Sequence, residues 1–267
     1  MKFLIKTDDY NSLEQVDYDR VVYEEKEDSQ KVFVSKGQKI YEYVDLGLPS
    51  GLRWAKCNIG ADTEEDAGLY FQWGDTQGYT AEQVGVDKEF ATNFSDYKWY
   101  GDGGFTKYNT VDKKVTLDLE DDAARVIMGG SWEIPTSEDC VELFKNTDFY
   151  LITNDDREVS GSVVQENSTG NPILTIQFEK SPSTCKGMKF YKKGDHSVSL
   201  FVPSAGYAIG GRLEGVGVGG YFWASSLFSV GVNAFCCGFI SDSGQGRVYA
   251  GVLCGGFPVR GIMRKPG

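Results

Sequence analysis

The 267-residue sequence has one histidine, seven prolines and six cysteines, and no two cysteines form a Cys-x-x-Cys pair. Zinc sites use cysteine and histidine at short, recurrent spacings, and His196 neighbours no cysteine in such a spacing. It lies in the polar run Lys192–Ser197, which is typical of a surface loop and not of a base held beside a nucleophile. The sequence therefore predicts no metal site, no cofactor and no catalytic residue.

Long apolar runs are also missing. No stretch approaches the roughly 20 apolar residues of a membrane-spanning helix, and Met1–Asp9 becomes charged too early for the apolar region of a signal peptide. Acidic residues exceed basic residues by 39 to 27, a net charge of −12, whereas binding nucleic acid through its phosphates needs the opposite excess. We expect no membrane insertion, no nucleic-acid partner, and either export by another route or a leader that is missing.

The cysteines do not indicate a disulfide framework. Cys236 and Cys237 are adjacent, so on a strand their side chains point to opposite faces and are poorly placed to bridge each other. The sequence favours unbridged thiols at all six positions, which are Cys57, Cys140, Cys185, Cys236, Cys237 and Cys254.

Glycine and tyrosine are abundant, with 33 and 15 residues, which favours a turn-rich β or α+β protein over a helical bundle. Residues 1–40 are charged and hold two β-like runs, Arg20–Tyr23 and Lys31–Val34, around a polar stretch. A lone hairpin is marginally stable. We therefore expect 1–40 to be an attachment segment that docks on the main domain, on a larger assembly or on other copies, as in a homo-oligomer such as a trimer. The ligand-binding domain is expected at 41–267.

The main domain begins with a strand, a turn and a strand. Apolar runs at Tyr43–Leu48 and Leu52–Ala55 flank a Pro-Ser-Gly turn, and an aromatic strand is expected within Gly68–Asp75. Beyond Phe149 the sequence predicts successive short strands, followed by Gly-rich β structure.

Two helices are predicted. The first covers about 119–128, with Asp118 as its N-cap and acidic residues in its first turn. The second begins after Thr136, a capping residue followed three positions later by Asp139, and ends near Asn146. The N-terminal end of the first helix, with Asp118 as its cap, also explains the acidic run at 118–122. A carboxylate pair or a calcium site is the alternative there, and calcium is a further alternative at Asn154–Asp156.

Three sequence blocks occur in order, at Tyr43–Leu52, Gly129–Thr136 and Pro203–Tyr207, with further matches at Glu120–Ala124 and Tyr221–Ser226. On these blocks the chain resembles the Fibrobacter succinogenes major paralogous domain family of gut Bacteroidetes and their phages, over roughly residues 41–264. The resemblance implies a C-type-lectin-like fold, an α+β domain with two helices and mostly antiparallel short strands. That fold is related to the fold of formylglycine-generating enzymes.

The resemblance also implies a role outside the cell. Many family members carry lipoprotein or secretion signals that this sequence does not show, which favours a phage virion tail over a bacterial cell surface. We expect a non-enzymatic receptor-binding protein or adhesin whose partner is a protein or glycan on a bacterial or host surface. One alternative is a structural cell-surface or phage-tail module without a selected ligand. Another is an enzyme like the formylglycine-generating ones, which use a cysteine pair with copper, although the cysteine spacing does not match.

The end of the chain is the expected ligand-binding part. Between Glu214 and Lys265 there is neither lysine nor glutamate. One interpretation is that buried strands exclude charge. The other is that this region resembles the variable region of diversity-generating retroelement proteins, in which adenine-directed mutation of asparagine codons scatters replacements over a fixed lectin scaffold. On the second interpretation an exposed apolar patch binds the partner. Its residues are Phe222, Ala224, Phe228, Val230, Val232, Phe235, Cys236, Gly238, Ile240, Val248, Ala250, Val252, Cys254 and Phe257.

Overall fold

Short runs of β-forming residues, separated by glycine-rich turns, give the chain a strand-rich fold. A computed structural model describes residues 22–25, 31–34, 41–86, 90–167 and 173–264, and within these ranges every strand pair is antiparallel. The larger sheet contains, in spatial order, β13 (Asp195–Pro203), β12 (Cys185–Lys192), β9 (Thr147–Thr153), β10 (Glu158–Asn167), β11 (Ile173–Phe178), β18 (Gln245–Val252), β17 (Asn233–Ile240) and β16 (Gly219–Ser229).

A second, smaller sheet is separate from it. Its order is β1 (Val22–Glu25), β2 (Lys31–Val34), β3 (Tyr41–Val44), β4 (Arg53–Ala55), β20 (Ile262–Met263) and β8 (Trp132–Glu133). Three strand pairs complete the fold: β14 (Tyr207–Ile209) with β15 (Arg212–Glu214), β19 (Phe257–Pro258) with β5 (Tyr70–Phe71), and β6 (Tyr100–Gly101) with β7 (Gly104–Phe105).

Strands β1 and β2 pair with each other, and β2 also pairs with β3, so this pair continues the smaller sheet. Residues 1–21 and 26–30, which include part of the expected hairpin and its loop, lie outside the described residues. The attachment role of residues 1–40 therefore stays a prediction. The strand, turn and strand expected from Tyr43 is confirmed, since β3 and β4 pair across the turn.

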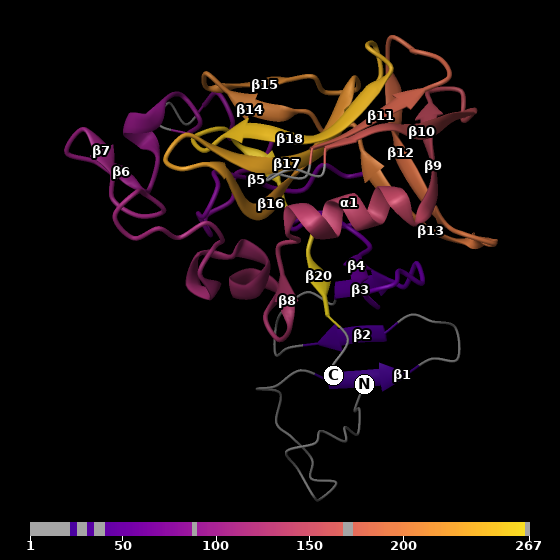
Figure 1. Ribbon diagram of the computed structural model, residues 1–267, viewed down its shortest axis with the longest axis horizontal. Helices are drawn as coiled ribbons and strands as arrows, with labels where there is room; N and C mark the ends of the chain where they lie inside the picture. Colours follow the sequence, from indigo (N-terminus) through magenta and orange to yellow (C-terminus); the bar gives the residue numbers. More distant parts are fainter. Residues whose placement is uncertain (1–21, 26–30, 35–40, 87–89, 168–172, 265–267) are drawn as a thin grey trace, which may run out of the picture.

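The second predicted helix is confirmed as α1 (Ser137–Lys145). Thr136 caps it by accepting a hydrogen bond from the backbone amide of Asp139, and the Asp139 carboxylate accepts one from the amide of Thr136. This reciprocal pair satisfies amides that the first helical turn leaves open. The buried side of the helix, with Leu143 and Phe144, packs on the larger sheet. In Figure 1 it lies between the larger sheet and strands β3, β4 and β20.

Helical structure also forms where the first helix was expected, but in two short pieces. A 3-10 turn, η2 (Leu119–Asp121), is followed by a five-residue π-helix, η3 (Ala124–Met128), and Asp118 makes no side-chain capping bond. The acidic residues expected in the first turn of that helix make other contacts. The Asp122 carboxylate accepts the backbone amides of Arg125 and Ile134, and Asp122 itself has extended backbone angles that interrupt the helix.

Both faces of β16 and β17 are covered over most of their length, whereas β18 leaves Gln245 and Arg247 exposed. One face contributes Phe222, Phe235 and Val248 to the core shared with α1. The other face contributes Trp223 and Cys236 to a second core, which is closed by side chains from residues 55–134 and 253–263. Lysine and glutamate are costly to bury without a partner. The absence of these residues from β16 and β17 therefore follows from burial on two sides.

Two tryptophans join β16 reciprocally to β5 and to the residues that follow it. The Trp223 indole donates to the carbonyl of Phe71 at 2.7 Å, and the Trp73 indole donates to the carbonyl of Ala224 at 2.8 Å. All four residues are buried, and each bond satisfies a buried carbonyl. The bonds attach the long segment after β5 to the sheet.

Arg260 is fully buried and joins three further segments. Its guanidinium donates to the Asn58 side chain at 2.8 Å, to the Ala55 carbonyl at 3.0 Å and to the Phe201 carbonyl at 3.1 Å. Burial lowers the pKa of Arg260 to about 10, so the group stays charged at neutral pH. Carbonyl oxygens compensate for its lost hydration.

These observations show a mixed, strand-rich fold built from antiparallel sheets, in agreement with the broad expectation. In the described ranges no helix is long and apolar enough to cross a membrane.

Candidate functional site

Eight of the fourteen predicted ligand-binding residues are buried. The prediction of one exposed patch is therefore wrong for these eight. Six lie on β16, β17 or β18 and are buried against one core or the other, and Cys254 and Phe257 belong to the second core. The eight are Phe222, Ala224, Phe235, Cys236, Gly238, Val248, Cys254 and Phe257.

The other six keep some exposure: Phe228, Val230, Val232, Ile240, Ala250 and Val252. Val230 and Val232 lie in the turn between β16 and β17. Val252 lies next to this turn, because it pairs in register with Asn233. Ile240 is at the other end of β17, where it pairs with Gln245. The structure thus gathers most of the exposed residues at one end of the sheet.

A groove of about 360 Å³ opens at this end. Val115, Phe228 and Val230 line it, and α1 contributes Ser137 and Glu138. Val115 is held against β16, because its carbonyl accepts the backbone amide of Leu227 at 2.8 Å. Val115 is 58% exposed, Val230 40% and Val232 46%. Val115 and Val230 therefore face solvent at the hollow, and Val232 faces solvent in the adjoining β16–β17 turn.

An aromatic side chain extends this surface. A Cβ atom built on Gly231, in the β16–β17 turn, would lie 2.9 Å from the Phe105 ring, so that ring packs directly on the turn. Phe105 itself is half-buried and contacts the ring of Phe94, with centroids 5.2 Å apart. We name Phe105, Val115, Phe228, Val230 and Val232 the end surface. Phe105 and Val115 were not predicted, since each lies more than a hundred residues from the turn and neither has a local sequence signal.

The groove carries little charge. Among its lining residues only Glu138 is charged, and the Glu138 carboxylate accepts a hydrogen bond from the Ser137 hydroxyl at 2.9 Å. The backbone amide of Ser137 donates to the Ser226 hydroxyl at 3.3 Å. The polar groups at the start of α1 are thus already partnered, and the end surface offers a ligand mainly apolar contact.

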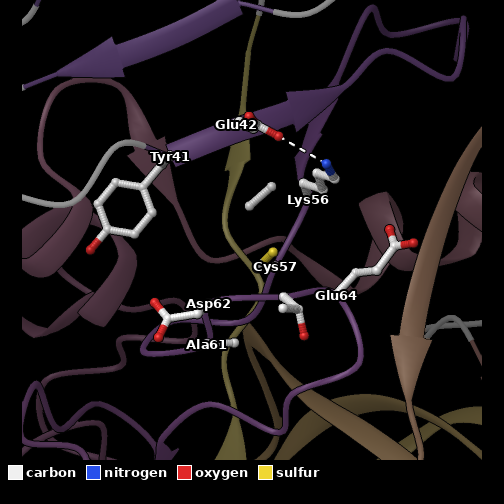
Figure 2. A pocket seen from close by; sticks show the side chains of 9 residues that line it. Tyr41, Glu42, Lys56, Cys57, Ala61, Asp62 and Glu64 are labelled. Atoms are coloured by element: carbon white, nitrogen blue, oxygen red, sulfur yellow. Dashed lines mark hydrogen bonds and ion pairs between the residues drawn. The ribbon is translucent and has the colours of Figure 1, made fainter.

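A second hollow, of about 400 Å³, is more polar. Figure 2 shows Glu42 and Lys56 paired at its rim, Asp62 and Glu64 across from them, and the Cys57 side chain between. The Lys56 ammonium is 3.0 Å from the Glu42 carboxylate. That hydrogen bond is the largest influence on Lys56 and raises its pKa. The pair keeps both charges at the rim of the hollow.

The acidic run at 118–122 forms a compact carboxylate group. Oxygens of Asp118, Glu120 and Asp121 lie within 4.8 Å of one another, as calcium ligands would. The Lys107 ammonium already lies among them, 2.6 Å from Asp118, 2.5 Å from Asp121 and 3.5 Å from Glu120. Burial by itself would lower the pKa of Lys107, but its hydrogen bonds to Asp118 and Asp121 outweigh that effect and raise the pKa. A lysine thus supplies the positive charge that a metal would bring.

The six cysteines form no disulfide, and the environment of four of them does not favour thiolate chemistry. A nucleophilic or metal-binding cysteine needs a lowered pKa. Burial instead raises the pKa of the thiols of Cys140, Cys185, Cys236 and Cys254, for Cys254 to about 11. His196 is exposed and pairs with Asp148 at 3.0 Å.

At Asn154–Asp156, the alternative calcium loop, the acids have protein partners. Asp155 binds Arg157 at 2.7 Å and Asp156 binds Lys186 at 2.5 Å.

Comparisons with known proteins find no matching family model, no matching curated protein and no matching solved structure. The resemblance to the Fibrobacter succinogenes major paralogous domain family, and the C-type-lectin-like fold that it implies, therefore stay predictions.

Proposed function

We propose that this chain is a non-enzymatic receptor-binding protein that contacts its partner through the end surface. The observation that carries the proposal is the group of exposed valines around the β16–β17 turn, beside the Phe105 ring. Exposed apolar side chains gathered in and beside a hollow are uncommon on a protein surface that binds nothing, because water contact with them is unfavourable.

The chemistry of the surface supports a macromolecular partner. Its aromatic and aliphatic side chains gain free energy when they leave water, and the polar groups at the start of α1 can form a rim. The low charge means that shape, more than electrostatic attraction, selects the partner. By the resemblance, we propose a receptor on the surface of gut Bacteroidetes cells, met by a phage tail or by another cell.

The test is binding of fluorescently labelled protein to intact cells of a panel of Bacteroides strains, measured by flow cytometry. We expect saturable binding to some strains and at least about tenfold weaker binding after Val230→Glu with Val232→Glu, since buried charge without a partner is costly. Val216→Glu is the matched control, because Val216 is also exposed, at 58%, but lies outside the end surface.

Two results would count against the proposal. If no strain binds the protein, the structural module without a selected ligand becomes the better hypothesis. If the doubly substituted protein binds as tightly as the Val216→Glu control, the receptor contacts another part of the chain.

A further inference from the structure

A polar and aromatic face lies on the outer side of the larger sheet, where β9 runs between β10 and β12. Successive side chains of a strand point to opposite faces. Phe149 and Leu151 enter the core, whereas Tyr150 and Ile152 remain half-buried on the outer side. Lys189 lies directly opposite Tyr150 in the register. Figure 1 shows these strands at the opposite end of the molecule from β6 and β7, and so from the end surface.

A cavity of about 330 Å³ opens on this face, next to the 63–66 loop. Its apolar lining residues are Ile152 and Phe201. Its charged lining residues are Glu64, Glu65, Asp156, Glu158, Lys186 and Lys189. Asp156 and Lys186 pair with each other at 2.5 Å. Three other carboxylates and the Lys189 ammonium stand beside the two apolar side chains, a combination that neither a nonpolar nor an anionic ligand matches.

Contacts within the face hold several of these groups in place. The Tyr191 hydroxyl donates to the Glu158 carboxylate. The Tyr191 ring stacks on His196 at 4.6 Å, and the Lys189 ammonium lies 5.1 Å from the centroid of the same ring. Burial, with the hydrogen bond to Glu158, raises the pKa of Tyr191 to about 12, so its hydroxyl stays a donor. Glu158 and Lys189 are thereby oriented before any ligand arrives.

We propose that this cavity binds a neutral saccharide unit. A sugar ring presents C–H groups that can pack on Ile152 and Phe201, and hydroxyls that donate to carboxylates and accept from ammonium groups. Phosphates and acidic sugars are disfavoured, because carboxylates outnumber ammonium groups at the cavity. The site is separate from the end surface, and the inference does not rest on the proposed receptor.

The experiment is an amide NMR titration of the full chain with methyl glycosides of glucose, galactose, mannose and N-acetylglucosamine, and with glucose 6-phosphate as the charged comparison. We expect at least one neutral glycoside, at dissociation constants of about 1 mM, to shift the amides of Ile152, Glu158 and Lys189. Glu158→Gln should weaken binding about tenfold, the loss of one charged hydrogen bond. Glu166→Gln, the same change on the same strand but outside the cavity, should leave the affinity unchanged.

The proposal is overturned if no neutral glycoside shifts these amides, if only the phosphate-bearing sugar does, or if Glu158→Gln and Glu166→Gln bind equally well. The spectrum of each variant shows whether it is folded. The Val230→Glu, Val232→Glu protein should keep its saccharide shifts even where it no longer binds cells, so failure of one proposal is distinguishable from failure of the other.

Discussion

Replacing Lys107 by methionine tests whether the carboxylate group at 118–121 depends on a lysine. The Lys107 side chain is 17% exposed and lies within 3.5 Å of three carboxylates, of which Asp121 is only 3% exposed. Methionine keeps most of the volume and removes the charge. The substitution leaves Asp121 with the Lys98 ammonium, 3.4 Å away, and the Tyr108 hydroxyl, 2.6 Å away.

The expected loss can be worked from this geometry. Removing one partner of a fully buried ion pair costs roughly 3–5 kcal/mol. Lys107 is partly exposed and Asp121 keeps two other partners, so we expect the free energy of unfolding to fall by about 2 kcal/mol. Lys114→Met is the matched control. Its ammonium pairs with Asp118 at the surface, where it is 42% exposed, and a pair of that kind contributes about 0.5 kcal/mol.

Urea unfolding followed by tryptophan fluorescence measures both variants, and Trp99 is a suitable reporter because the Lys107 ammonium is 4.9 Å from its ring. Lys107→Met should unfold at clearly lower urea than Lys114→Met, with the same slope. Equal midpoints for the two variants, or a more stable Lys107→Met protein, would refute the reasoning.

Three further predictions follow from the same contacts. Adding calcium should leave the melting temperature of the unmodified protein unchanged, because an ammonium group already lies among the carboxylates; a rise of several degrees in a thermal scan would contradict this. Trp223→Phe should cost about 2 kcal/mol in urea unfolding, because the buried carbonyl of Phe71 loses its donor. Hydrogen bonds from Lys107, then from Lys114, lower the pKa of Asp118 below 3.8. Its contribution to stability should therefore be complete above about pH 5 and disappear as the pH falls through the lowered pKa. The stability difference between unmodified protein and Asp118→Asn, measured across acidic pH, should shrink accordingly, and a constant difference would show that the charge of Asp118 does not matter.

The features that the sequence predicted well depend on neighbouring residues. Thr136 and Asp139 form their capping box within one helical turn, so the start of α1 could be found from spacing alone. The expected first helix resembled it in sequence, with acids after Asp118. There the acids bind more distant groups instead. Asp121 accepts a hydrogen bond from the Lys107 ammonium, and Asp122 accepts one from the amide of Ile134. A local sequence pattern does not show whether an acidic residue caps a helix or binds a distant group.

The candidate site could be predicted only in part for the same physical reason. Alternation along β16 and β17 separates the two faces of a strand, but it does not say that both faces are covered. The second cover comes from residues 55–134 and 253–263, whose packing on Trp223 and Cys236 is a tertiary effect. Phe105 belongs to the end surface through a single close approach to Gly231.

Burial on both faces also limits what a variable C-terminal region could do in this chain. Replacing a buried large apolar side chain such as Phe222 by a small one costs about 3–5 kcal/mol, a large share of the 5–15 kcal/mol that holds a typical domain folded. Exposed positions such as Val230 and Val232 tolerate replacement at little cost. If sequence diversity is used to select partners, it must therefore concentrate in the β16–β17 turn and spare the strands that lead to it. The end surface combines that tolerance with apolar contact area, whereas most of the originally predicted residues in β16, β17 and β18 are needed to hold the two cores together.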